Sequence, residues 1–370
     1  MTTLPSLERI PETMLAAADY EVRAVDHITS PTLAWLAGGS GTEQTLRSNR
    51  TAFESLRIQP RLLNDFSQAS TRIELCGVDF PHPFLLAPLG HQGLLHPEAE
   101  LATARAANAT DTGLILSTLS SVNLEALAES CSASKWFQLY FQPRPDDTLA
   151  LVRRAEAAGF EAIVITLDAP VQPLSRRAQL AGFAFPTQMP PPNLANFAPP
   201  EQVTLQPGQS ILLHGMMSET PLWSDVPWLI KHSRLPIIVK GVMHSDDAMR
   251  LRDLGVEAQV ISNHGGRALD GAPSSLFALK TVRKSLGPDY PLLMDGGIRS
   301  GNDIFKALAC GADAVLIGRL QGYALATAGA LGVAHMLKLL RDELELCMAQ
   351  AGTPTLADIT LESLLGEVPC

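Results

Sequence analysis

The sequence AQVISNHGGRALDG, residues 258–271, decides the fold and indicates what the chain does. It begins with an apolar run, residues 258–262, that is too short for a helix and is typical of a buried strand. Gly265 and Gly266 then allow a sharp turn and the close approach of a flat ligand. His264 can take a proton, and Arg267 can hold an anion with its planar guanidinium. The alternative interpretation is a plain turn with a capping histidine.

Seven other runs of the same kind lie along the chain, and amphipathic helical stretches separate them. The eight runs cover residues 84–87, 114–117, 136–140, 162–166, 236–240, 258–262, 292–295 and 314–318. Continuous apolar strands that alternate with helices are typical of a parallel sheet covered on its outer face. Eight such units predict an α/β fold, a (β/α)8 TIM barrel. An open doubly wound sheet is the alternative, but no strand-to-helix turn carries Gly-x-Gly-x-x-Gly.

The spacing of these runs also predicts the domain organisation. We expect residues 1–370 to form a single domain, with the barrel at about 84–345. Residues 11–60 show helical periodicity and form an N-terminal helical segment ahead of the barrel. The interval between the fourth and fifth runs, about 169–235, is too long for an ordinary connection and predicts a lid.

Composition excludes several classes of protein. The net charge of −10 argues against nucleic acid, which selects basic surfaces. No run reaches the roughly 18 apolar residues of a membrane span. The N-terminus lacks the basic start and apolar core of a secretory signal. The five cysteines are scattered without a Cys-x-x-Cys pair, which predicts a cytoplasmic protein with no metal site.

Polar residues and glycines follow nearly every strand at its carboxyl end, where barrels place their chemistry. These ends are residues 88–90, 117–120, 138–140, 166–168, 240, 264–267, 295–297 and 318–319. A ring of hydrogen-bonding and ionisable groups is hard to explain without a ligand. After the seventh and eighth strands, Gly297, Arg299, Gly318 and Arg319 offer backbone N–H groups and two guanidinium groups. Barrels commonly bind phosphate at this place.

At this point the sequence resembles the FMN-dependent 2-hydroxy acid oxidases and dehydrogenases, such as glycolate oxidase, lactate oxidase and mandelate dehydrogenase. The resemblance extends from about residue 20 to about residue 345. Its most specific motifs are Ser262-Asn263-His264-Gly265-Gly266-Arg267 and Asp295-Gly296-Gly297-Ile298-Arg299. Supporting matches are His96-Pro97-Glu98, Gln138-Leu139-Tyr140, Thr166-Leu167-Asp168 and Val239-Lys240-Gly241.

The resemblance implies a reaction, the oxidation of a 2-hydroxy acid to the 2-keto acid with FMN as cofactor. His264 would be the base that takes the substrate proton, while a hydride passes to flavin N5. Asp168 would pair with His264 and steady the imidazolium that forms. Lys240 would face the flavin where negative charge develops on reduction. Arg267 would grip the substrate carboxylate, and Tyr140 would donate a hydrogen bond to the substrate. A structural ion pair is the alternative for Lys240 and Asp168.

The resemblance also implies which residues surround the flavin: its ring edge, its ribityl chain and its phosphate. These are Ala87, Pro88, Leu89, Ser117, Gln138, Thr166, Lys240, Ser262, Asp295, Gly297, Arg299, Gly318 and Arg319. The electron acceptor would be oxygen or another oxidant. Relatives of this kind are commonly homotetramers, so a homo-oligomer is expected.

Two positions depart from the family pattern, and both concern the substrate. Trp35 stands where the family usually has a tyrosine whose hydroxyl reaches the substrate carboxylate. An indole donates only through its N–H, from a different place. Ser175 stands where the family has a second arginine. Two outcomes are open: Arg176, one residue later, takes over this contact to the substrate carboxylate, or the contact is lost.

Relatives often carry alanine at the position of Gly90, and the glycine has two possible explanations. It resembles the lactate monooxygenase branch, in which the keto acid is decarboxylated oxidatively, and it also makes room for a bulkier substrate. With two carboxylate donors missing, we expect a preference for an acid with a large apolar or aromatic side chain, which recovers affinity through burial. The alternative from another class is a flavin-binding protein with altered activity.

Overall fold

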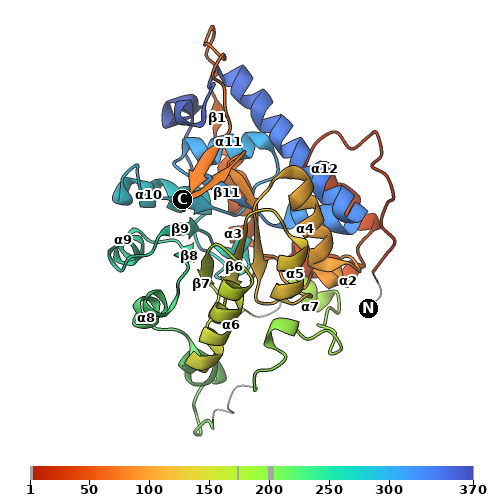
Figure 1. The fold of residues 1–370 in the computed structure, drawn as a ribbon, viewed down its shortest axis with the longest axis vertical. Coiled ribbons are helices and arrows are strands. Elements are labelled where there is room, and N and C mark those ends of the chain that lie inside the picture. Colours follow the sequence, from red (N-terminus) through yellow and green to blue (C-terminus); the bar gives the residue numbers. More distant parts are fainter. Residues whose placement is uncertain (1–2, 173–174, 199–203, 370) are drawn as a thin grey trace.

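Eight parallel strands close into a barrel, and helices surround it (Figure 1). The computed structural model describes residues 3–172, 175–198 and 204–369. The strands are β4 (Phe84–Leu86), β5 (Leu114–Ser117), β6 (Lys135–Leu139), β7 (Ile163–Thr166), β8 (Ile237–Val242), β9 (Ala258–Ile261), β10 (Leu292–Met294) and β11 (Ala314–Ile317). Neighbouring strands pair in chain order, and β11 closes the ring by pairing with β4. All eight strands that the sequence predicts are confirmed, and the doubly wound alternative is excluded.

A helix follows each barrel strand. These helices are α4 (Ala99–Thr110), α5 (Leu124–Ser130), α6 (Pro145–Ala157), α8 (Asp225–His232), α9 (Ser245–Asp253), α10 (Ser275–Leu286), α11 (Gly301–Ala309) and α12 (Arg319–Ala351). The predicted end of the barrel at about residue 345 is slightly early, because α12 continues to Ala351 and ends at Gly352 in the left-handed conformation. The C-terminal residues return to the barrel's helical shell, where β12 (Leu364–Leu365) pairs with β1 (Arg57–Ile58).

The core has two parts because side chains alternate across each strand. One set of buried strand residues fills the barrel, including Leu85, Ile115, Val164 and Leu316. The other set faces the helices and joins their apolar sides in a much larger cluster. The hairpin of β2 (Ile73–Leu75) and β3 (Val78–Phe80) adds to the interior set, with Phe80 packed edge-on against Trp136 of β6 at 6.0 Å.

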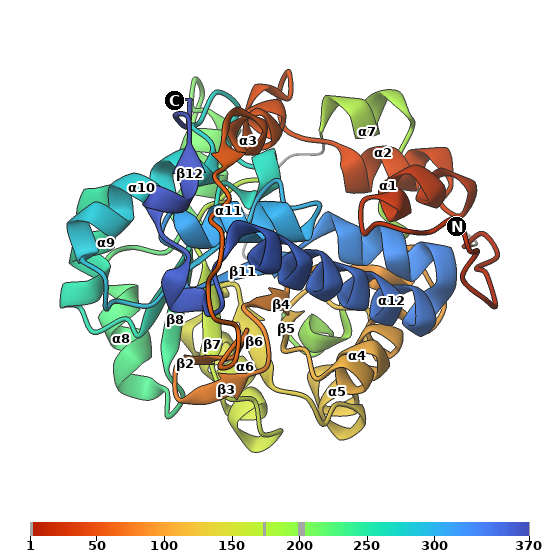
Figure 2. The same ribbon diagram turned by 90° about the horizontal axis from the view of Figure 1, so that it is seen from above.

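The N-terminal helical segment covers the mouth of the barrel from one side. It consists of α1 (Asp19–Arg23), the short 3-10 helix η1 (Ala24–Asp26), α2 (Ser30–Ala37) and α3 (Gln44–Ser55). Figure 2 shows α1 and α2 beside α12, with α7 (Arg176–Leu180) of the lid next to α2. Two segments that lie far apart in the sequence therefore meet over one part of the barrel.

The predicted lid has little regular structure. Besides α7, its described part contains the short helices η3 (Pro192–Leu194), η4 (Ile211–Gly215) and η5 (Met216–Glu219), and the predicted range also includes α8. Residues 173–174 and 199–203 of the lid lie outside the described residues. Three further short helices lie elsewhere: η2 (Gln92–Leu94), η7 (Leu356–Asp358) and η8 (Leu361–Ser363).

Helix α12 is the one helix of the described residues that is long and apolar enough to cross a membrane. Its most apolar window is 67% buried inside the protein. It packs against α4, α11 and α1. Burial of this kind is ordinary for a core helix of a large barrel.

Candidate active site

The turn after β9 has a backbone shape that depends on glycine. His264, Gly265 and Gly266 form the short helix η6, and φ is positive at all three (58°, 61° and 75°). A Cβ on Gly265 would lie 2.7 Å from Nη1 of Arg319, and one on Gly266 would lie 2.6 Å from the backbone nitrogen of Leu46. Only glycine fits at these two positions. The turn therefore holds His264 in an uncommon conformation at the carboxyl end of the barrel.

Helix α3 fixes this turn from the N-terminal segment. The side chains of Asn49 and Asn263 exchange two hydrogen bonds of 2.8 Å, both buried. The Oδ1 of Asn263 also accepts the Gly266 N–H at 3.1 Å. Because every one of these buried amide groups has a partner, the turn is stabilised from two sides.

His264 and Asp168 form the pair that the resemblance implies. Nδ1 of His264 lies 2.7 Å from Oδ1 of Asp168. Nδ1 therefore carries the proton that this hydrogen bond needs, and Nε2 of the neutral ring is left as an acceptor. Burial would raise the pKa of Asp168, but Lys240 and His264 outweigh it and hold that pKa below its usual value. Asp168 therefore stays ionised beside the His264 ring.

Lys240 lies at the centre of a buried charge network in the barrel mouth. Its Nζ is 3.0 Å from Asp295, 3.7 Å from Asp168 and 2.8 Å from the hydroxyl of Ser262. Burial alone would lower the pKa of Lys240, but the two carboxylates raise it above its ordinary value. Lys240 is therefore a fixed cation, as a group that faces developing negative charge needs to be.

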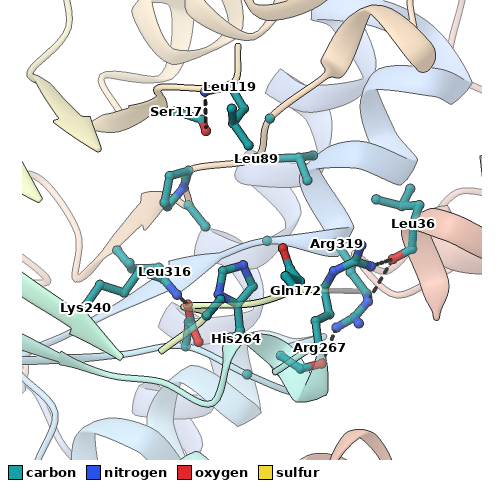
Figure 3. A pocket seen from close by; sticks show the side chains of 18 of the residues that line it. Leu36, Leu89, Ser117, Leu119, Gln172, Lys240, His264, Arg267, Leu316 and Arg319 are labelled. Carbon is teal, nitrogen blue, oxygen red and sulfur yellow. Dashed lines mark hydrogen bonds and ion pairs between the residues drawn. The ribbon is translucent and has the colours of Figure 1, made fainter. Parts of the chain in front are cut away.

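Arg267 is buried with part of its guanidinium unused. Its Nη1 donates to the carbonyl oxygens of Trp35 (2.6 Å), Leu36 (3.3 Å) and Gly38 (3.1 Å). Its Nε and Nη2 have no hydrogen-bond partner among the described residues. Figure 3 shows Arg267 beside Arg319 and near His264 in the cavity wall. The free nitrogens suit a carboxylate that lies next to His264.

A cavity of about 440 Å³ joins these groups at the carboxyl ends of the strands. Fourteen of the predicted site residues line it: Trp35, Ala87, Pro88, Leu89, Ser117, Tyr140, Lys240, His264, Arg267, Asp295, Gly297, Arg299, Gly318 and Arg319. Burial raises the pKa of Tyr140 to about 12, so its hydroxyl stays protonated and able to donate.

Five predicted site residues do not line this cavity. They are Gln138, Ser262, Thr166, Arg176 and Asp168. Asp168, Gln138 and Ser262 support it from behind: the hydroxyl of Ser262 donates to Asp295 at 2.6 Å, and the Ser117 hydroxyl donates to Gln138 at 3.1 Å. Thr166 lines a neighbouring cavity of about 680 Å³ under the lid, which touches the first at Tyr140 and Ala169. Arg176 is exposed and lines neither cavity.

The barrel mouth suits a flat, polar-edged ligand. Within the described residues, Nε2 of Gln138 and Oγ1 of Thr166 are buried without any hydrogen-bond partner. Buried polar atoms are almost always paired, so these two call for a ligand edge or ordered water. They belong to the residues that the resemblance assigns to the ring edge of FMN. The donors and acceptors of the barrel mouth therefore fit the ring edge of FMN.

The other end of the cavity suits an anion. Burial and the nearby guanidinium groups of Arg267 and Arg299 lower the pKa of Arg319 to about 9. Arg319 donates to three backbone carbonyls, those of Leu36, Gly265 and Gly38, at 2.8–3.0 Å. Of these three buried cations, only Arg299 has a carboxylate hydrogen-bonded to it among the described residues, and a phosphate would neutralise the charge that remains.

Glu21 is a residue of this end that the sequence analysis missed. Its carboxylate accepts from Nε of Arg299 at 2.6 Å and from Nη2 at 3.2 Å. The ion pair ties α1 to the turn after β10 and holds Arg299 in place. Glu21 lies more than two hundred residues from Arg299 in sequence and has no motif around it, so sequence alone gives no signal for it.

The prediction for Arg176 is wrong in its geometry. Ser175 caps α7 by accepting the Ala178 N–H at 3.1 Å, and its side chain packs over Gly38. Arg176 then starts the helix as an exposed residue and does not line the cavity. The cap turns the chain so that Arg176 cannot replace the missing arginine.

Aromatic residues occupy the substrate side of the cavity instead. Trp35 stacks on Phe183 at 5.5 Å with an angle of 12°, and Phe185 packs edge-on against Trp35 at 5.7 Å. The ring of His91 lies 4.8 Å from Phe185. Phe183 and Phe185 follow α7, so the lid and the N-terminal segment meet here. The sequence analysis did not single out these three partners of Trp35, because single aromatic residues in loops carry no recognisable pattern.

The comparisons with known proteins agree with this geometry. Residues 24–365 match the FMN-dependent dehydrogenase family. An L-lactate oxidase of Alicycliphilus denitrificans is 52% identical, over 96% of this chain and 98% of its own length. A 4-hydroxymandelate oxidase of Amycolatopsis orientalis is 40% identical, over 92% and 95% of the two chains. A crystal structure of mandelate oxidase superposes with a TM-score of 0.86 at 38% identity and covers 96% of this chain and 99% of that one.

The fold and the site define a flavin-dependent oxidoreductase built on a (β/α)8 barrel. The chain belongs to the FMN-dependent dehydrogenase family, and its cofactor is FMN. The individual roles of its site residues rest on the geometry described above.

Proposed function

We propose that the protein oxidises a short-chain 2-hydroxy acid, of the size of L-lactate, to its 2-keto acid. The observation that carries the proposal is the His264–Asp168 pair at 2.7 Å, next to Lys240 and to the unused guanidinium nitrogens of Arg267. A base, its charge partner and a carboxylate anchor are the groups that this oxidation needs in one cavity.

Each of these residues has a separate role in binding or in proton transfer. Arg267 holds the substrate carboxylate through Nε and Nη2, and Tyr140 donates a hydrogen bond from its protonated hydroxyl. Nε2 of His264 takes the proton of the C2 hydroxyl, and Asp168 stabilises the imidazolium that results. The C2–O bond becomes a carbonyl as the hydrogen on C2 leaves with its electron pair. FMN supplies the acceptor for that hydrogen and its two electrons. Lys240 offsets the negative charge that collects in the barrel mouth.

Two packing contacts support a small substrate over a large aromatic one. One face of Trp35 stacks on Phe183, and the guanidinium of Arg267 lies 5.5 Å from the same ring. The indole is thus already packed by the protein's own groups. A Cβ on Gly90 would lie 3.0 Å from both Cβ and the carbonyl oxygen of Leu119, so Leu119 fills the room beside Gly90. The earlier preference for bulky acids is therefore revised towards small ones.

The similarity to an L-lactate oxidase at 52% identity supports the same conclusion. It also supports oxygen as the electron acceptor, since the relatives named above are called oxidases. The close packing of Leu119 against Gly90 explains why this position has a glycine in place of alanine. Gly90 therefore does not by itself favour lactate monooxygenase-like decarboxylation. A homotetramer and a cytoplasmic location stay predictions.

Anaerobic mixing of the FMN-loaded protein with a panel of acids tests the proposal. The panel contains glycolate, both lactate enantiomers, 2-hydroxyoctanoate and mandelate. We expect L-lactate to bleach the flavin absorbance fastest, with pyruvate as the product. No bleaching by any member of the panel would show instead a flavin-binding protein of altered activity. Mandelate or 2-hydroxyoctanoate as the best substrate would contradict the proposed substrate size.

A further inference from the structure

The substrate carboxylate lacks two of the donors expected for it, which raises the question of what replaces them. This inference rests on the proposed function. Trp35 has no hydroxyl, Ser175 is used as a helix cap, and Arg176 is exposed outside the cavity. A small acid has little apolar surface with which to recover the lost affinity. Another donor at the same end of the cavity is therefore needed.

His91 is a polar side chain at that place which the reaction described above does not use. It lines the same cavity as His264 and Arg267 and directly follows Gly90. Its ring packs against Phe185 at 4.8 Å and against Trp35 at 6.4 Å. His91 therefore lies where the N-terminal segment, which carries Trp35, meets the lid, which carries Ser175.

The backbone holds His91 firmly in this place. Its N–H donates to the Leu119 carbonyl at 2.9 Å, and its own carbonyl accepts the Leu94 N–H at 3.0 Å. Its φ of 55° and ψ of 36° are in the left-handed region, which side chains other than glycine seldom adopt. An uncommon conformation that is held from both sides and faces a cavity points to a role in that cavity.

The imidazole is free to bind a ligand. Neither ring nitrogen of His91 has a hydrogen-bond partner among the described residues, although the ring is largely enclosed. Burial lowers the pKa of His91, so the ring is neutral near pH 7 and presents one N–H donor. The neutral ring avoids placing another cation beside Arg267.

We propose that His91 is a substrate-binding residue that donates a hydrogen bond to the carboxylate of the 2-hydroxy acid, together with Arg267. It takes over the contact that the absent tyrosine hydroxyl and the absent second arginine would make. The enzyme thus holds the carboxylate with a guanidinium and an imidazole that follow different strands of the barrel, β9 and β4. Phe185 of the lid packs on the imidazole and orients it.

The experiment compares His91→Phe with His91→Gln in the FMN-loaded protein. Phe keeps a ring against Phe185 but has no donor, whereas Gln keeps an N–H donor without the ring. We measure kcat and KM for L-lactate and for methyl L-lactate, which has the same skeleton without the charge. A lost hydrogen bond to a charged group predicts a KM for L-lactate that rises roughly tenfold to a hundredfold in H91F. We expect kcat to change by less than about threefold, and H91Q to recover most of the loss.

The ester and a binding titration separate the possible explanations. A carboxylate contact predicts that methyl L-lactate is affected much less by H91F than lactate is. An equal loss for both substrates, or no recovery in H91Q, would show that the ring acts through packing and would overturn the inference. So would a KM for lactate in H91F within twofold of the parent. Trp35→Phe is the matched variant, because it removes the indole N–H of Trp35, the other nearby donor. A larger rise in the KM for lactate in W35F than in H91F would assign the carboxylate contact to the indole.

A test without turnover keeps this inference apart from the proposed function. Pyruvate, the proposed product, carries the same carboxylate, and its dissociation constant can be read from the flavin absorbance. We expect H91F to weaken pyruvate binding by a factor similar to its effect on KM, even if turnover is slow. If no 2-hydroxy acid reduces the flavin of the parent, the proposed function fails. If the parent is reduced but pyruvate binds equally to the parent and to H91F, only the assignment of His91 fails.

Discussion

The two ends of the active-site cavity are built in different ways. The phosphate end, with Arg299, Gly318 and Arg319, follows the family pattern, and its residues lie on turns directly after β10 and β11. The carboxylate end, with Trp35 and Phe185, combines the N-terminal segment and the lid, and it departs from the pattern. The comparison teaches that strand ends of a barrel preserve the cofactor site, whereas segments from outside the barrel determine which substrate fits.

The largest effect on the rate of flavin reduction is expected at the His264–Asp168 pair, which lies between the two ends of the cavity. Asp168→Asn removes the negative charge that lies 2.7 Å from Nδ1 of His264 but keeps a side chain of the same shape. We predict that anaerobic flavin reduction slows by roughly a hundredfold or more. Stopped-flow absorbance measures the rate, and the flavin content serves as the control. An unchanged rate at full FMN content would mean that Asp168 is structural only.

The next effect concerns the phosphate end. Arg299 is neutralised by Glu21, whereas Arg319 hydrogen-bonds only to backbone carbonyls among the described residues and has a pKa lowered to about 9. We predict that Arg319→Met weakens FMN binding roughly tenfold to a hundredfold, because one charge-assisted contact to the phosphate is lost.

Arg299→Met is the matched variant, and we expect it to weaken FMN binding less. Fluorescence titration of the apoprotein with FMN gives both dissociation constants. A larger effect for Arg299 than for Arg319 would mean that the ion pair with Glu21 breaks when phosphate binds.

Below the carboxylate end, a buried carboxyl group predicts a dependence of stability on pH. Oε1 of Glu100 accepts the backbone N–H groups of Gln92 and Ser121, whereas Oε2 is buried without a partner among the described residues. Burial raises the pKa of Glu100 from its ordinary 4.5 to about 7. The folded state therefore holds this proton more tightly than the unfolded state does.

For a raised pKa of this kind, the stability that Glu100 contributes is fully present below about pH 4.5. It is lost as the pH rises through about 7. The shift corresponds to a loss on the order of 3 kcal/mol by pH 8. We predict that Glu100→Gln removes this part of the slope between pH 5 and 8. Urea unfolding at several pH values measures it, and equal slopes for parent and variant would refute the role of Glu100.

The smallest effect is expected at Gly90. An added methyl group would press on Leu119 at 3.0 Å, so Gly90→Ala forces a local shift. We predict a loss of about 1–2 kcal/mol in stability and an unchanged ratio of kcat/KM for lactate over mandelate. If Gly90 instead makes room for the substrate, the variant will lose mandelate activity selectively, and the ratio will rise.

The same contrast explains how much the sequence could predict. The eight strands and thirteen of the fourteen predicted cavity-lining residues lie in or just after apolar runs that are followed by glycine, Asp, Lys or Arg, so the sequence marks them locally. The remaining one, Trp35 on α2, was named only from the family resemblance. Glu21, His91 and Phe185 were missed because their importance comes from contacts across the chain. Arg176 was placed wrongly because Ser175 reads as a lost arginine, whereas in the structure it is a helix cap that turns the next residue outward.

The most direct test of the central claim, that His264 is the base of a 2-hydroxy acid oxidation, is the anaerobic reduction of the His264→Ala variant by L-lactate. We predict that this variant keeps FMN, because the imidazole lies at the Asp168 end of the cavity and not beside Arg299 and Arg319 at the phosphate end. We also predict that flavin bleaching slows by a factor of roughly 10² to 10⁴ relative to the parent. Bleaching by the variant at a rate near the parent's, with FMN fully bound, would contradict the account.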